Sequence, residues 1–170
     1  PELAASDAPT EESLQASPEL QEEVPSVAPP AVVKTTARDA EYRNVRSDLE
    51  RAIRKGDWNA AVAAGDELFI LSTTVDWEAH LWVAKTHRRL GHSQRAAELF
   101  EDFAQRFTAN RHRAKSAYIA GVLFTELGEL GAAASNFNTV LDGPKPAFKR
   151  KARAALKKLE ADLVSEGEQE

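Results

Sequence analysis

Histidine is the residue type in this chain that could bind a metal ion, and its spacing decides whether it can. His80 and His87 lie seven residues apart in a stretch with helical periodicity, His92 follows in a turn, and Glu78 is nearby. Residues seven apart on a helix are separated by about 10 Å along its axis, whereas each ligand of a zinc ion lies about 2 Å from the metal. The spacing therefore argues against a shared ion, and we expect no metal site.

Catalytic motifs of the usual kinds are missing from the sequence. It holds no cysteine, which excludes disulfides, thiolate ligands and thiol nucleophiles. Neither a glycine-rich phosphate loop nor a nucleophile elbow is present, and the acidic residues are scattered rather than paired. The sequence therefore predicts a protein that is not an enzyme, with no catalytic residue, no cofactor and no small-molecule substrate.

Length and composition predict one folded domain with an acidic extension. The chain has 170 residues, of which 29% are charged, and no apolar run long enough to span a membrane. Residues 1–37 contain six prolines and seven acidic residues against a single lysine, Lys34, and no aromatic residue. Such a segment cannot bury enough apolar surface to offset its ordering entropy. We expect residues 1–37 to be a disordered linker, either a spacer or an acidic arm that docks on the protein's own basic surface or on a partner.

Three glycines mark the turns of the part that must fold. Gly56, Gly91 and Gly128 each stand between two amphipathic stretches, 35 and 37 residues apart, and alanine stands five residues after each of them. Glycine suits the left-handed position that ends a helix, and alanine suits a place where two helices cross closely. The pattern predicts helices over residues 36–55, 58–71, 75–90, 93–107, 111–127, 130–141 and 146–164.

This pattern resembles the tetratricopeptide repeat, which packs helix pairs of about 34 residues into a right-handed superhelix. Small residues, Ala84 and Gly121, lie seven positions before two of the turn glycines, whereas the first unit departs from the family pattern at Leu49 and Gly65. The end of an array tolerates such a departure. The resemblance implies an all-α fold, a right-handed α-solenoid of three helical hairpins with a C-terminal capping helix. It places the domain at residues 38–164, with repeats at about 42–74, 75–110 and 111–142, the cap at 146–164 and an acidic tail at 165–170.

The resemblance also bears on the histidines and on the last helix. His80 and His87 match inward-facing positions of the family, so we expect them in the core or half-buried, where protonation at low pH would soften the array. The last helix carries apolar residues such as Phe148 on one face and six cations around the other. We expect it to cover the last hairpin, its cations being either solvated or a patch for an anionic partner.

In the family pattern the first helix of each pair lines a concave groove. The resemblance places a mainly basic set of residues there around an apolar centre, which implies a protein or peptide partner with apolar anchors and acidic flanks. The alternative is that Trp82 and Ile119 pack between neighbouring first helices and the arginines only solvate the surface. The implied groove residues are Arg43, Arg46, Leu81, Trp82, Lys85, Arg88, Arg89, Lys115, Tyr118 and Val122, beside Glu50, Arg54, Glu78, Ile119 and Glu126.

Two functions follow from the resemblance. The 37-residue step, with Phe103, Phe107 and the basic entry at 111–113, resembles periplasmic Tol–Pal-associated proteins and outer-membrane assembly lipoproteins, which implies an interaction scaffold in a bacterial envelope. The other is a regulatory appendage of a cytoplasmic signalling or anti-sigma-type protein. An isoelectric point near 5.5 opposes nucleic-acid binding. The atypical first unit could also pair with a second copy of the chain, making a homo-oligomer.

Overall fold

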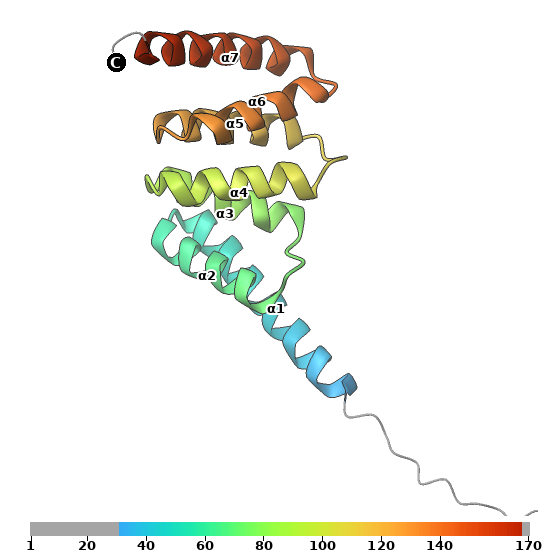
Figure 1. The fold of residues 1–170 in the computed structure, drawn as a ribbon. Coiled ribbons are helices and arrows are strands. Elements are labelled where there is room, and N and C mark those ends of the chain that lie inside the picture. The colour runs from blue at the N-terminus through green and yellow to red at the C-terminus, as the bar shows by residue number, and fades with distance from the viewer. Residues whose placement is uncertain (1–30, 168–170) are drawn as a thin grey trace, which may run out of the picture. The chain divides into compact units, whose positions relative to one another are not determined.

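The computed structural model describes residues 31–167, with side chains described for residues 37–162. This part of the chain is all-α, and each helix packs against the next one in sequence. Figure 1 shows the hairpins stacked in chain order as a solenoid. The predicted linker up to residue 30 and the last residues of the predicted acidic tail, 168–170, lie outside the described residues. The helices are α1 (Ala31–Lys55), α2 (Trp58–Leu71), α3 (Trp77–Arg89), α4 (Ser93–Arg106), α5 (Arg113–Glu126), α6 (Leu130–Asp142) and α7 (Pro146–Gly167).

The three turn glycines adopt the predicted left-handed conformation. Gly56, Gly91 and Gly128 have φ angles of 72°, 77° and 78°. In each turn the amide that follows the glycine donates to a carbonyl one turn back in the helix, as from His92 to His87 over 3.0 Å. The glycine amide itself donates to the next carbonyl along, so the helix ends in a Schellman motif. The predicted hairpin turns are confirmed.

Alanine at position 91 is expected to lower the free energy of unfolding by about 1 kcal/mol, because a β-carbon disfavours left-handed backbone. A Cβ at Gly91 would meet no atom within 4 Å, so the cost is conformational and not steric. Gly131 is the matched control, since it lies in α6, has no positive φ and also has open space at its Cβ. Urea unfolding should show that Gly131→Ala is at least as stable as the wild type; equal losses at both sites would contradict this account.

One predicted helix start is corrected by the structure. Helix α1 begins at Ala31, five residues before the start expected at Thr36, so residues 31–37 are helical and do not belong to a linker. The reason is local, because no proline or glycine stands between Pro30 and Gly56 to interrupt the helix. The other helix ends lie within three residues of their predicted places.

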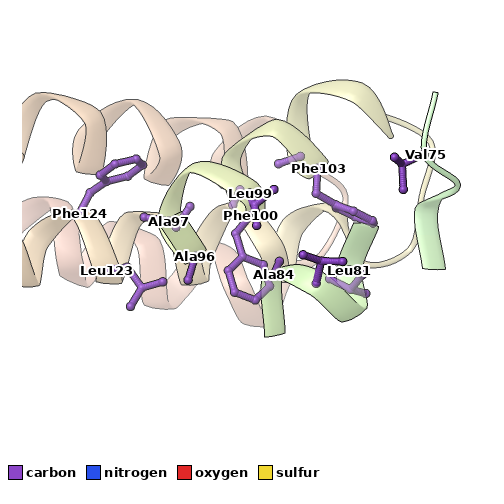
Figure 2. Close-up of a cluster of buried hydrophobic side chains, with 14 of the residues drawn as sticks. Val75, Leu81, Ala84, Ala96, Ala97, Leu99, Phe100, Phe103, Leu123 and Phe124 are labelled. Carbon is purple, nitrogen blue, oxygen red and sulfur yellow. The ribbon is translucent and has the colours of Figure 1, made fainter. Parts of the chain in front are cut away.

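The core runs along the stack between the helices. The alanines predicted at helix crossings, Ala61, Ala96 and Ala133, are fully buried, and Phe100 and Phe137 are nearly so. Figure 2 shows Phe100 and Phe103 of α4 in this core, with Phe124 of α5 nearby. Close helix packing explains this choice of small residues.

Helix α7 covers the last hairpin, as predicted. It packs mainly on α6 and also contacts α5. Its Ala152 and Leu159 are buried, while its basic side chains, such as Arg150 and Lys157, remain exposed. A helix that is apolar on one side and charged on the other ends the stack without leaving an apolar surface open.

Candidate functional site

Adjoining hollows follow the faces of α1, α3 and α5. The largest, of about 420 Å³, is lined by Ile53, Trp58, Trp82, Lys85, Thr86, Arg88 and Arg89. A second, of about 150 Å³, shares Ile53 and Trp82 with it and is completed by Glu50 and Arg54. A third, of about 140 Å³, shares Arg88 and is completed by Tyr118, Ile119, Val122, Leu123 and Glu126. Neighbouring hollows share lining residues and together follow the first helices of the three hairpins; the three are termed the groove below.

The apolar centre of the groove is made by two tryptophans and an isoleucine. Trp82 is half-buried and packs on the core, as does Ile53. Trp58 is half-buried and also lines the groove, where the guanidinium of Arg89 lies 4.2 Å from its ring centroid. The aliphatic carbons of arginine and lysine pack well on such rings while their charges stay in water.

Arg46 is engaged within the protein and is not a free cation of the groove. Its Nε donates to Asp76 Oδ2 over 2.8 Å, its Nη2 donates to Glu78 Oε2 over 3.3 Å, and its Nη1 donates to Glu50. The guanidinium also lies 5.3 Å from the ring centroid of Trp82. Arg46 therefore ties α1 to the start of α3, a structural role that the sequence did not reveal.

Asp76 links this network to the start of α3. Its Oδ1 accepts from the amides of Glu78 and Ala79 and so caps the helix, and Tyr42 donates to its Oδ2 over 3.1 Å. Burial would raise the pKa of Asp76, but the hydrogen bonds from Arg46 and from Ala79 outweigh it and lower that pKa. A carboxylate that accepts several such bonds is held ionised in the folded state.

Asp76→Ala is expected to lower the free energy of unfolding by about 2 kcal/mol, because it removes a helix cap and leaves Arg46 without one of its three carboxylate partners. Asp57 is the matched control, since its side chain caps α2 through one bond to the amide of Ala60, 3.0 Å long. Asp57→Ala should cost about 1 kcal/mol. Thermal unfolding of both variants measures the difference, and equal losses would show that Arg46 and Tyr42 add nothing to the cap.

Unpaired cations lie at the other end of the groove. Lys85 and Arg88 of α3 line the first hollow, whereas Lys115 of α5 lines none of the three and is an electrostatic neighbour of Lys85. All three are exposed, and they form no ion pair with a residue whose side chain the structure describes. Burial lowers the pKa of Lys85, and the positive charge of Lys115 lowers that pKa further. The ammonium of Lys151 on α7 lies 5.9 Å from the ring centroid of Tyr118. This end of the groove is therefore positive.

Some of the implied groove residues lie elsewhere. Leu81 is only 5% exposed and belongs to the core, because consecutive helical residues point about 100° apart and Trp82 faces the groove. Arg43 is exposed but lines none of the three hollows. Tyr118 and Val122 line the third hollow, although Tyr118 also packs on Phe137, with ring centroids 5.8 Å apart. Leu81 and Arg43 thus lie outside the groove, whereas Tyr118 both lines it and packs on α6.

The two histidines on α3 are core residues, as predicted. His80 is 0% and His87 is 4% exposed. His80 Nε2 lies 2.9 Å from the carbonyl oxygen of Leu99, and His87 Nε2 lies 3.3 Å from Asp66 Oδ1. Among the described residues, no group of three or more histidine or carboxylate side chains is arranged to hold a metal ion.

The described part of the chain also lacks any helix with the length and apolar character needed to cross a bilayer. What the fold and the groove define is a helical-repeat protein, an α-solenoid of three hairpins with a capping helix and an open, partly apolar groove.

Comparison with known proteins adds a likeness to a solved structure. No family model and no curated protein matches the sequence. Among solved structures, the chain is similar to PcrH from Pseudomonas aeruginosa, with 18% sequence identity and a TM-score of 0.49. The match covers 71% of this chain and 92% of the PcrH chain.

Proposed function

We propose that the protein is a non-catalytic scaffold that binds a protein or peptide partner in the groove. The observation that carries this proposal is the groove itself, in which half-buried aromatic side chains form an open apolar floor beside unpaired cations. Tryptophan, tyrosine and arginine are the residues that most often dominate binding energy at protein interfaces. A depression that crosses three first helices is also long enough to take an extended or helical segment.

The proposed location is the bacterial envelope, as part of an assembly there. It is supported by the sequence resemblance of the 37-residue step between Gly91 and Gly128 to envelope proteins with such repeats. The cytoplasmic alternative, a regulatory appendage, has the same groove and differs in partner. Fractionation of the source cells, with detection of the native protein, separates the two.

Trp82→Ala is expected to reduce capture of the native partner at least ten-fold, because truncating a central aromatic residue at an interface commonly costs 2 kcal/mol or more. The wild type and the variant would serve as baits in the source-cell extract, with captured proteins quantified by mass spectrometry. Trp77→Ala is the matched control, since Trp77 is also half-buried but stacks on His112, with ring centroids 5.9 Å apart, and lines none of the groove's hollows.

Circular dichroism must show that both variants remain helical. Partners that the wild type and Trp77→Ala capture, and that Trp82→Ala loses, support the groove. If all three baits capture the same proteins in equal amounts, the groove is not the binding site.

A further inference from the structure

The two ends of the groove carry opposite charge balances. At the α1 end, Arg46 is bonded to three carboxylates, and Arg54 lies 3.6 Å from one of them, Glu50. Three carboxylates, of which only Glu50 lines a hollow of the groove, thus balance two cations, and this network holds no unpaired positive charge. An acidic partner gains nothing there from electrostatic attraction.

At the α5 end the balance is reversed. Lys85, Arg88 and Lys115 have no carboxylate within ion-pairing distance among the described side chains, and Lys151 adds a fourth cation near Tyr118. Glu126 is the single acidic residue among those that line the third hollow. Cations brought together on a partly desolvated surface repel one another, and an anion placed between them relieves the repulsion.

The apolar hollow lies next to this positive end. Its floor is formed by Trp58, Trp82 and Ile53, and Lys85 and Arg88 stand on its wall. At about 420 Å³, the hollow has room for a large apolar side chain. One anchor position and one positive zone therefore lie side by side, in a fixed order along the groove.

We propose that the groove selects an acidic peptide segment in one chain direction. A large apolar side chain of the segment occupies the hollow at Trp82, and Asp or Glu residues on one side of that anchor pair with Lys85, Arg88 and Lys115. This inference rests on the proposed function of the groove and names the chemistry of its partner. Charge complementarity fixes the register and direction of the bound segment, since the reverse direction would place carboxylates against Glu50, Asp76 and Glu78.

Three pools of labelled twelve-residue peptides test this inference by fluorescence anisotropy. Each peptide has one central Phe, with four Asp or Glu residues before it in the first pool, after it in the second, and replaced by Ser and Asn in the third. One acidic pool should bind the full chain at least ten-fold more tightly than the other two, and its affinity should fall when NaCl is raised from about 50 to 300 mM. Equal binding of both acidic pools, or of the neutral pool, overturns the inference.

Charge-reversal variants test which cations of the protein bind the acidic peptide. Lys85→Glu and Lys115→Glu should each weaken binding of the preferred acidic pool at least ten-fold. Arg43→Glu is the matched control, with the same charge change on an exposed cation of α1 instead of α3 or α5, and should weaken binding less than two-fold. Equal losses in all three variants would mean that net charge alone attracts the peptide, and the inference fails.

The chain's own acidic N-terminal residues are the competing occupant. Residues 31–170 form one compact unit, so a shortened chain that starts at Ala31 can be compared with the full chain. Equal affinities for the acidic pool support a separate partner. Tighter binding by the shortened chain would identify residues 1–30 as the occupant and overturn the assignment to a partner. If no pool binds while Trp82→Ala still loses the native partner, acidic recognition fails and the proposed function stands.

Discussion

Alanine at position 121 is expected to lower the free energy of unfolding by about 3 kcal/mol, at the upper end of the usual cost of overpacking a core. A Cβ at Gly121 of α5 would lie 2.6, 2.8 and 2.9 Å from three ring atoms of Phe137 on α6. The ring cannot swing away, because Phe137 is 1% exposed and its other neighbours include the ring of Tyr118. The helices of the third hairpin would have to separate.

A double-mutant cycle tests whether this one contact causes the loss. Phe137→Leu removes ring atoms that the new Cβ would meet, so Gly121→Ala should cost less in its presence by at least about 1 kcal/mol. Urea unfolding of the wild type, both single variants and the double variant gives this coupling energy. Strictly additive losses would show that Phe137 does not set the requirement for glycine at position 121.

The repeat could be predicted from the sequence because each of its rules is local. A left-handed turn requires glycine at Gly56, Gly91 and Gly128, and a close helix crossing requires a small residue wherever the hairpin places it. Gly65, where the first unit departs from the family pattern, is also required by a close approach of two helices. A Cβ there would lie 2.6 Å from a methyl carbon of Val83, so α2 and α3 also need a glycine to approach.

The groove could be predicted only in part, because its properties depend on contacts between distant residues. Arg46 was expected to be a free cation, but its partner Asp76 lies 30 residues away, and neither residue alone indicates the pairing. Leu81 and Trp82 are neighbours in sequence, and assigning both to one face ignored the 100° turn between them. Arg89 and Trp58 meet because α2 and α3 pack together with the start of α2 beside the end of α3. A weak signal was present, since a tryptophan that begins a helix is seldom covered on every side.

A loss of stability below pH 6.5 is the other large effect that we expect, and it originates at the buried histidines of α3. His80 is enclosed by the rings of Phe69, Phe103 and Phe107, with centroids 5.1 to 5.8 Å from its own. Its Nε2 donates to the carbonyl of Leu99, since a carbonyl only accepts, and its buried Nδ1 has no hydrogen-bond partner. Burial lowers the pKa of His80, and this outweighs the opposing effects of the Leu99 carbonyl and of Asp102.

His87 contributes in the same direction. Burial lowers its pKa more than the carboxylate of Asp66 raises it, and electrostatic interactions with His92 and Arg95 lower this pKa further. In the unfolded chain each histidine has an ordinary pKa near 6.5. Below that pH the unfolded state therefore binds more protons than the folded state, in which the two histidines stay neutral. Stability contributed by the neutral histidines is therefore complete above pH 6.5 and falls as the pH drops toward the lowered pKa values of the folded state.

The slope of the unfolding free energy against pH should approach about 1.4 kcal/mol per pH unit for each histidine in this window. Urea unfolding at pH 8, 6.5, 5.5 and 5 measures it, and His80→Leu should remove one histidine's share while keeping an apolar side chain among the phenylalanines. The network at Asp76 acts in a separate window, because the lowered pKa of that carboxyl makes its contribution disappear only below its ordinary value of 3.8. An unchanged slope between pH 6.5 and 5 in His80→Leu would show that protonation of His80 does not drive the loss.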